Sequence, residues 1–107
     1  MPTFVAVHKW PKETFIAITK ELIAGFTAMS KGETPKDIAL HNTWSRVDDG
    51  AFCVWEAPSK EALVKLFEQY LPTMLKYTEF VPVTQMYPPT MEYILGLMQM
   101  GVDMTPK

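Results

Sequence analysis

Cysteine is almost missing from this sequence, because Cys53 is the only one among 107 residues. A single cysteine cannot form an internal disulfide, which excludes a small secreted fold held together by disulfides. A free thiol is typical of a reducing compartment. We therefore expect a cytoplasmic protein.

The net charge of the chain is small as well. The chain has 10 basic and 12 acidic side chains, so its formal net charge is -2 at pH 7. Such a chain has no positive field with which to attract phosphate groups. Nucleic acid is therefore not an expected partner.

Long apolar runs and catalytic signature motifs are missing as well. The longest apolar stretch is interrupted by Glu92, Gly96, Gln99 and Gly101, and the N-terminus lacks the basic and apolar regions of a signal peptide. We therefore expect no membrane segment. The sequence has no phosphate-binding glycine loop, nucleophile elbow, CxxC pair or dinucleotide fingerprint, which argues against nucleotide-dependent chemistry.

Apolar material, by contrast, is abundant. Hydrophobic residues make up 48% of the chain and include eight Met, three Trp and six Phe. This is more than one domain of this size readily buries, so we expect part of the apolar surface to lie in an oligomer interface.

Residues 38–56 carry the strongest local pattern, that of a β-hairpin. Asp48, Asp49 and Gly50 have the turn chemistry that a tight hairpin requires. Residues that favour extended backbone lie on both sides of the turn: Thr43, Trp44, Val47, Phe52, Val54 and Trp55.

The elements around the hairpin can be placed from the residues that begin and end them. Residues 3–10 alternate as a central strand that is apolar on both faces. Pro11 then starts an amphipathic helix that ends near Gly32. After the hairpin, Ser59 is the expected N-cap of a second helix, which Pro72 ends or kinks.

The last strand is expected over residues 77–87. It contains Pro82, and because proline cannot donate a ladder hydrogen bond, this strand should lie at a sheet edge. In the remaining residues, Thr90 is the expected N-cap of a short extra helix. We expect this helix to cover a sheet edge or to cross to a partner chain.

The predicted order is therefore strand, helix, strand, strand, helix, strand. This is the βαββαβ order of the ferredoxin-like α+β folds, with a four-stranded antiparallel sheet whose edges are the second and last strands. Pro82 falls on such an edge, which supports the assignment. We expect residues 1–87 to form this domain and residues 88–107 to form a C-terminal helical extension.

Two helices cover only one face of a four-stranded sheet. We assign Phe4, Ala6, Cys53 and Trp55 to the uncovered face. A second sheet from an identical subunit is the simplest cover for them. The sequence therefore predicts a homodimeric α+β barrel with a cavity lined from this face.

Several of these features together resemble a known family. They are Trp44, the Asp49-Gly50 turn, the strand end at Glu56-Ala57, a helix carrying Leu63 and Tyr70, and Phe80-Val81-Pro82-Val83. The pattern covers most of residues 3–84 and is similar to a family of small uncharacterised proteins in the dimeric α+β barrel superfamily. The resemblance implies the fold and a homodimer. That superfamily includes cofactor-independent monooxygenases, lactone isomerases, haem-dependent enzymes and nickel-binding proteins, so the resemblance does not select a chemistry.

The register of the hairpin decides which side chains share the cavity. A three-residue loop of residues 48–50 would pair Ser45 with Cys53 and Thr43 with Trp55. A two-residue loop would instead set Trp44 opposite Trp55.

We favour the three-residue loop, because Gly50 suits a left-handed position. Together with Trp10, which adds an aromatic wall, this register predicts the ligand-binding residues to be Trp10, His41, Thr43, Cys53 and Trp55.

His8 is the candidate catalytic base, since it ends the central strand on the face that carries Phe4 and Ala6. The alternative is a buried histidine that only hydrogen-bonds its neighbours. A metal site would instead use His8, His41, Glu56 and Glu79, although no short metal-ligand spacing is present.

Three hypotheses about function follow. The first is a homodimeric barrel that binds a small, partly aromatic molecule, as a cofactor-independent oxygenase or isomerase if His8 acts as a base. The second is a nickel- or zinc-binding protein. The third is a structural or interaction protein whose barrel is filled by its own side chains. No cofactor is required by the first or the third.

Overall fold

The computed structural model describes residues 2–84 and 90–105. The elements follow one another as β1 (Thr3–Lys9), the 3-10 helix η1 (Lys12–Thr14), α1 (Phe15–Ser30), β2 (Ala39–Arg46), β3 (Gly50–Glu56), α2 (Lys60–Tyr70), α3 (Pro72–Leu75), β4 (Thr78–Val83) and α4 (Met91–Met104). The predicted order of strands and helices is confirmed. Of the strand expected over residues 77–87, residues 85–87 lie outside the described part of the chain.

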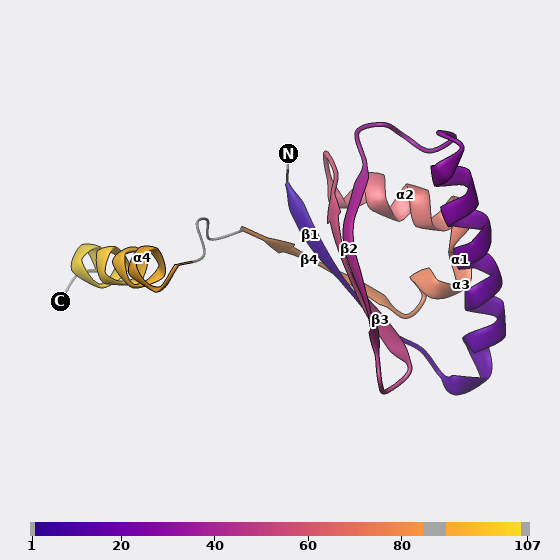
Figure 1. The fold of residues 1–107 in the computed structure, drawn as a ribbon, viewed down its shortest axis with the longest axis horizontal. Helices are drawn as coiled ribbons and strands as arrows, with labels where there is room; N and C mark the ends of the chain where they lie inside the picture. The colour runs from indigo at the N-terminus through magenta and orange to yellow at the C-terminus, as the bar shows by residue number, and fades with distance from the viewer. Residues whose placement is uncertain (1, 85–89, 106–107) are drawn as a thin grey trace.

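The four strands form one antiparallel sheet in the order β2-β3-β1-β4. Helices α1, α2 and α3 cover one of its faces (Figure 1). No helix in the described residues covers the other face, which we call the open face. The strand carrying Pro82 is an edge strand, as its sequence predicts. This architecture agrees with the ferredoxin-like α+β fold.

Side-chain caps determine where two of the helices begin. The Ser59 side chain accepts a hydrogen bond from the Ala62 backbone N–H at 3.2 Å, and Thr90 accepts one from Tyr93 at the same distance. Such caps satisfy backbone donors that have no partner inside the helix. The predicted C-terminal helix is therefore present, with the predicted cap, but none of its residues is buried.

The core lies between the sheet and the helices. Its largest fully buried side chains are those of Ile18, Leu63, Phe67, Met74 and His8. The aromatic ring of Phe67 packs edge-on against Trp55 and Phe80, with centroid separations of 5.7 and 5.0 Å. Such edge-to-face pairs stabilise a core beyond the area that they bury.

The prediction of which sheet face is open is wrong. Phe4, Ala6, Cys53 and Trp55, which we assigned to the uncovered face, are each at most 6% exposed and belong to the core under the helices. Strand β1 is apolar on both faces, so alternation alone cannot tell which set the helices cover.

Both predicted hairpin registers are also wrong. Arg46 pairs with Gly50, so the loop consists of residues 47–49, and Thr43 lies opposite Cys53. The left-handed conformation falls on Asp49, with φ of 64°, rather than on Gly50. Aspartate tolerates this conformation better than most residues.

Gly50 is needed for a different reason. It lies where β3 approaches β1, and a Cβ atom built there would collide with the carbonyl oxygen of His8. A register shift between Leu40 and Asn42 then leaves His41 outside the regular ladder and brings Leu40 opposite Trp55. His41 is thereby separated from the residues that the favoured register placed beside it.

Candidate functional site

A cleft of about 350 Å³ lies between helix α1 and the β2–β3 hairpin, on the covered side of the sheet. We call it the α1 cleft. Its apolar lining comes from Trp10, Phe15, Leu22, Phe26 and Met74. Its polar lining comes from Thr19, Thr43, Ser45, Arg46, Asp49 and Cys53. A mainly apolar wall with a few polar groups is typical of sites for small organic molecules.

Helix α1 supplies one wall because its apolar residues extend beyond the stripe that faces the core. Phe15 and Phe26 are 52% and 39% exposed although they belong to a helix that packs on the sheet. The Thr19 hydroxyl donates to the Phe15 carbonyl oxygen at 2.7 Å and so turns back onto its own helix. The wall therefore presents two aromatic rings with little competing polarity.

The opposite wall comes from the hairpin and contains the only cysteine. Cys53 Sγ lies 3.3 Å from Thr43 Oγ1, so the correct register brings these two predicted residues together. Burial raises the pKa of the Cys53 thiol, and the hydrogen bond with Thr43 partly opposes this. At neutral pH the cleft therefore contains a thiol rather than a thiolate.

The hairpin turn next to the cleft carries a cluster of charged side chains. Arg46 Nε and Nη2 each lie 2.7 Å from the carboxylate of Asp48, and Lys9 Nζ lies 3.0 Å from it. The guanidinium also lies over the ring of Phe52, 5.0 Å from its centroid. Phe52 alternates on β3 with Ala51 and Cys53, which line the cleft, so the guanidinium lies on the open-face side of the sheet, and neither Asp48 nor Lys9 lines the cleft.

The candidate base His8 lies beside the cleft rather than among its lining residues. Its side chain is fully buried, and its Nδ1 lies 2.6 Å from Thr78 Oγ1. Because Thr78 donates its one hydroxyl proton to the Met74 carbonyl oxygen, it must accept from His8, which places the imidazole proton on Nδ1. Nε2 is then a buried acceptor that has no partner among the described residues.

Burial lowers the pKa of His8 to about 4. The imidazole is consequently neutral at physiological pH, with an oriented Nδ1–H and an unprotonated Nε2. Such a nitrogen can accept a proton, although only weakly, since a low pKa makes a weak base.

The other predicted ligand-binding residues are divided among three places. Trp10 lines the α1 cleft together with Thr43 and Cys53. Trp55 is 2% exposed and packs in the core, and its indole N–H, like that of Trp10, has no hydrogen-bond partner among the described residues. His41 lies on the open face of the sheet. Sequence reasoning missed Phe15, Thr19, Leu22, Phe26 and Arg46, because it placed the cavity on the wrong face.

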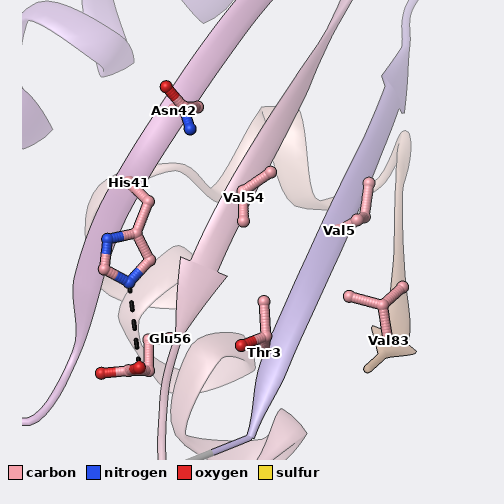
Figure 2. A pocket seen from close by; sticks show the side chains of 7 residues that line it. All are labelled: Thr3, Val5, His41, Asn42, Val54, Glu56 and Val83. Carbon is pink, nitrogen blue, oxygen red and sulfur yellow. Dashed lines mark ion pairs between the residues drawn. The ribbon is translucent and has the colours of Figure 1, made fainter. Parts of the chain in front are cut away.

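The open sheet face has a depression of about 640 Å³, which Figure 2 shows from close by. Val54 and Val5 stand on neighbouring strands there, and Val83 follows on β4 (Figure 2). At one side, His41 Nε2 lies 3.9 Å from Glu56 Oε1. The depression is thus lined by three valines, with Thr3, Asn42 and the His41–Glu56 pair around them. A shallow sheet face of this kind suits packing against another sheet better than holding a small molecule.

The alternative metal ligands do not come together within the described residues. His8 faces the helices, whereas His41 and Glu56 lie on the open face, and Glu79 pairs with Val7 farther along the sheet. Residues 2–84 and 90–105 contain no group of three or more His, Cys, Asp or Glu side chains placed to hold a metal ion. Nor does any helix in these ranges have the length and apolarity needed to cross a membrane.

Comparison with known proteins identifies a family but no activity. No curated protein matches the chain. Residues 3–87 match the family described as "Domain of unknown function (DUF3303)". This match spans β1 to the end of β4 and includes both the α1 cleft and the open sheet face. The chain therefore belongs to the DUF3303 family.

Proposed function

We propose that this protein binds a small, partly aromatic molecule in the α1 cleft. The observation that carries the proposal is the lining of the cleft. Two exposed phenylalanines and Trp10 supply aromatic surface, and the hydroxyl groups of Thr43 and Ser45 on β2 supply hydrogen bonds. Aromatic surface gives such a site affinity, and a few polar groups orient the ligand.

We further propose that two copies of the chain pack through their open sheet faces, as in the dimeric α+β barrel superfamily. This face is lined by half-buried valines, and Trp44 and Phe52 beside them are 54% and 37% exposed. Monomeric soluble domains rarely leave such an apolar surface in water, whereas two sheets packed face to face bury it. A cytoplasmic location remains part of the proposal, since the single cysteine is a free thiol.

Helix α4 adds to the surface that a partner would cover. Its exposed apolar side chains are Met91, Tyr93, Leu95, Leu97, Met98, Met100, Val102 and Met104. A helix with so few polar residues gains little from standing alone in water. We propose that it packs on the second subunit or along a sheet edge of the dimer.

A catalytic role for His8 is the second candidate function. The unprotonated Nε2, which has no partner among the described residues, favours it, because a base needs one oriented nitrogen and one nitrogen that can take up a proton. An oxygenase or isomerase reaction would require the ligand to reach past the lining residues to this nitrogen. Binding without chemistry requires no such approach, and we therefore rank it first.

Titration with prodan tests the binding proposal. Prodan is an uncharged naphthalene dye whose fluorescence shifts and brightens when it leaves water. We expect saturable binding of one dye per chain. Phe15→Ala should weaken it several-fold, because that ring lines the cleft. Ile16→Ala is the matched control, since Ile16 is 62% exposed on the same helix and does not line the cleft.

Two results would contradict the proposal. If prodan does not bind, the protein fits the third hypothesis, a structural or interaction protein whose interior is filled. If Phe15→Ala and Ile16→Ala bind the dye equally well, the dye occupies another surface, and the α1 cleft is not the site.

A further inference from the structure

A second, much smaller cavity shares a wall with the α1 cleft. It has a volume of about 10 Å³, which is room for one water-sized group, and we call it the inner cavity. Its lining is mainly apolar and includes Gly25, Phe26 and Met29 from α1, and Trp55, Leu66 and Leu71 from the core.

Phe26 separates the inner cavity from the α1 cleft. Among the described residues it is the only one that belongs to the linings of both. Its side chain is partly exposed, and exposed side chains change rotamer rapidly. A turn of this ring would therefore join the two spaces, and a short arm of a ligand in the cleft could pass into the inner cavity.

Trp55 gives the inner cavity a buried hydrogen-bond donor. Its side chain is almost fully buried, and its indole N–H has no acceptor within residues 2–84 and 90–105. A donor left without a partner away from water costs free energy, which an acceptor brought to it would recover. Because an indole N–H can only donate, the group that satisfies it must be an acceptor.

We propose that the ligand is an aryl carbonyl compound whose ring lies in the α1 cleft and whose short acyl arm passes Phe26 into the inner cavity, where the carbonyl oxygen accepts from Trp55 Nε1–H. A carbonyl brings an acceptor and no donor, whereas a hydroxyl would also bring a donor into a mainly apolar lining. The inference rests on the proposed function, because it names the class of molecule that the α1 cleft binds. Prodan itself carries a propionyl group on its naphthalene ring and belongs to this class.

Two matched competitors of prodan test the proposal in the full-length chain. 2-Acetylnaphthalene and 2-isopropenylnaphthalene have the same ring and nearly the same shape, but a methylene group replaces the carbonyl oxygen in the second. The isopropenyl compound is the more apolar, so it should bind better wherever no donor meets the oxygen. We expect instead that acetylnaphthalene binds the wild type about fivefold more tightly.

Three tryptophan variants locate the donor, with each affinity corrected for the affinity of prodan for that variant. Trp55→Phe should remove the preference for acetylnaphthalene, because it deletes the N–H and keeps an aromatic side chain. Trp44→Phe is the matched control and should keep the preference, since Trp44 is exposed and lines neither cavity. Trp10 lines the α1 cleft, and its N–H also has no acceptor in the described part of the chain. Trp10→Phe should weaken both compounds and keep their ratio.

Gly25→Ala tests the inner cavity without touching a tryptophan. A Cβ atom there would lie 3.5 Å from Tyr70 Cβ and 3.7 Å from Leu71 Cδ2, which are ordinary contacts with two other lining residues. The fold should therefore accept the methyl group, which takes up space in the inner cavity. We expect acetylnaphthalene to bind several-fold more weakly and unsubstituted naphthalene to be unaffected. Gly96→Ala is the matched control, because Gly96 lies on α4 and lines neither cavity.

The carbonyl proposal and the binding proposal fail in different ways. Equal affinities of the two competitors in the wild type, or a preference that survives Trp55→Phe, would overturn the role of Trp55 while prodan still binds in a Phe15-dependent manner. A preference lost in Trp10→Phe instead would place the carbonyl in the α1 cleft and overturn the role of the inner cavity, as would unchanged binding to Gly25→Ala. Absence of prodan binding in the wild type would remove both proposals. Circular dichroism melting verifies that Trp55→Phe is folded, and if it is not, the Gly25→Ala result decides.

Discussion

The imidazole ring of His8 stacks on the phenyl ring of Phe67, with centroids 5.9 Å apart and planes inclined by 16°. Thr78 receives the Nδ1–H at the ring edge. The imidazole thus has an apolar neighbour on its face and a neutral partner at its edge. Burial removes the water that would solvate a charged imidazole, and no anionic group in these contacts replaces it. The pKa of His8 is therefore lowered to about 4.

This environment predicts that folding stability depends on pH through His8. The unfolded chain binds a proton near pH 6.5, whereas the folded chain binds it only near pH 4. The stability is therefore fully present above the unfolded pKa and is lost as the pH falls toward the folded pKa. We expect urea unfolding to report a loss of up to about 3 kcal/mol between these two pH values.

His8→Gln should flatten this dependence, because glutamine does not titrate, even if the variant is less stable throughout. His41→Gln is the control, since His41 is exposed on the open face, and it should keep the wild-type slope. A His8→Gln slope equal to that of the wild type would show that the loss comes from other groups.

Gly50→Ala should destabilise the fold severely. A Cβ atom at this position would collide with the carbonyl oxygen of His8 and crowd Arg46 Cδ at 3.0 Å, so β3 could not approach β1. We expect a loss of about 3 kcal/mol or more in thermal or urea unfolding. Gly96→Ala is the matched control, because a Cβ atom there meets nothing within 4 Å. Alanine in that helix should be neutral or slightly stabilising, by about 0.5–1 kcal/mol locally.

Glu21 connects α1 to α3. Its carboxylate accepts hydrogen bonds from the backbone N–H groups of Thr73, at 3.0 and 3.1 Å, and Met74, at 3.2 Å, at the start of α3. Glu21→Gln should cost about 1 kcal/mol, because a neutral amide accepts these bonds less strongly. Glu13→Gln, an exposed substitution in η1, should change the unfolding midpoint little. Equal midpoints for the two variants would rule out the stabilising role of Glu21.

The order of the elements could be predicted from the sequence because each boundary has local chemistry. Ser59 and Thr90 cap helices as expected, and Pro82 lies on an edge strand where its missing N–H does no harm. These signals depend on a few neighbouring residues. They do not depend on which side of the sheet the helices occupy.

The open face and the hairpin register could not be predicted in the same way. Strand β1 is apolar on both sides, so its two faces look alike in the sequence. In the turn, Asp49 and Gly50 are both able to adopt a left-handed conformation. In the observed register, Asp49 has the left-handed conformation, and Gly50 lies against the backbone of His8. This contact joins β1 and β3, which are far apart in the sequence, so the residues of the turn do not reveal it.

The candidate site was consequently only partly predicted. Trp10, Thr43 and Cys53 do meet, because each lies on the helix side of the sheet. Phe15 and Phe26 were not predicted for the site, because the sequence shows them only as part of an amphipathic helix, whereas their exposure in the structure marks a second apolar face on α1. A helix whose apolar arc is wider than its contact with the sheet has surface left for a ligand.

The proposed dimer leads to the last prediction. Val54 lies on the open face, in the central part of the sheet, where a lysine would place a charge inside the proposed interface. We expect Val54→Lys to be a monomer in light scattering coupled to gel filtration, while the wild type is a dimer. Ile23→Lys is the matched control, because Ile23 is 64% exposed on α1, and it should remain dimeric.

Prodan titration of the same variant then tests whether ligand binding in the α1 cleft depends on the dimer interface. The α1 cleft is built within one subunit, on the side of the sheet away from Val54, so a folded Val54→Lys monomer should bind the dye with wild-type affinity. A monomer that has lost prodan binding would mean that the second subunit completes the site. A wild type that is itself monomeric would remove the shared barrel but leave the α1 cleft and its ligand intact.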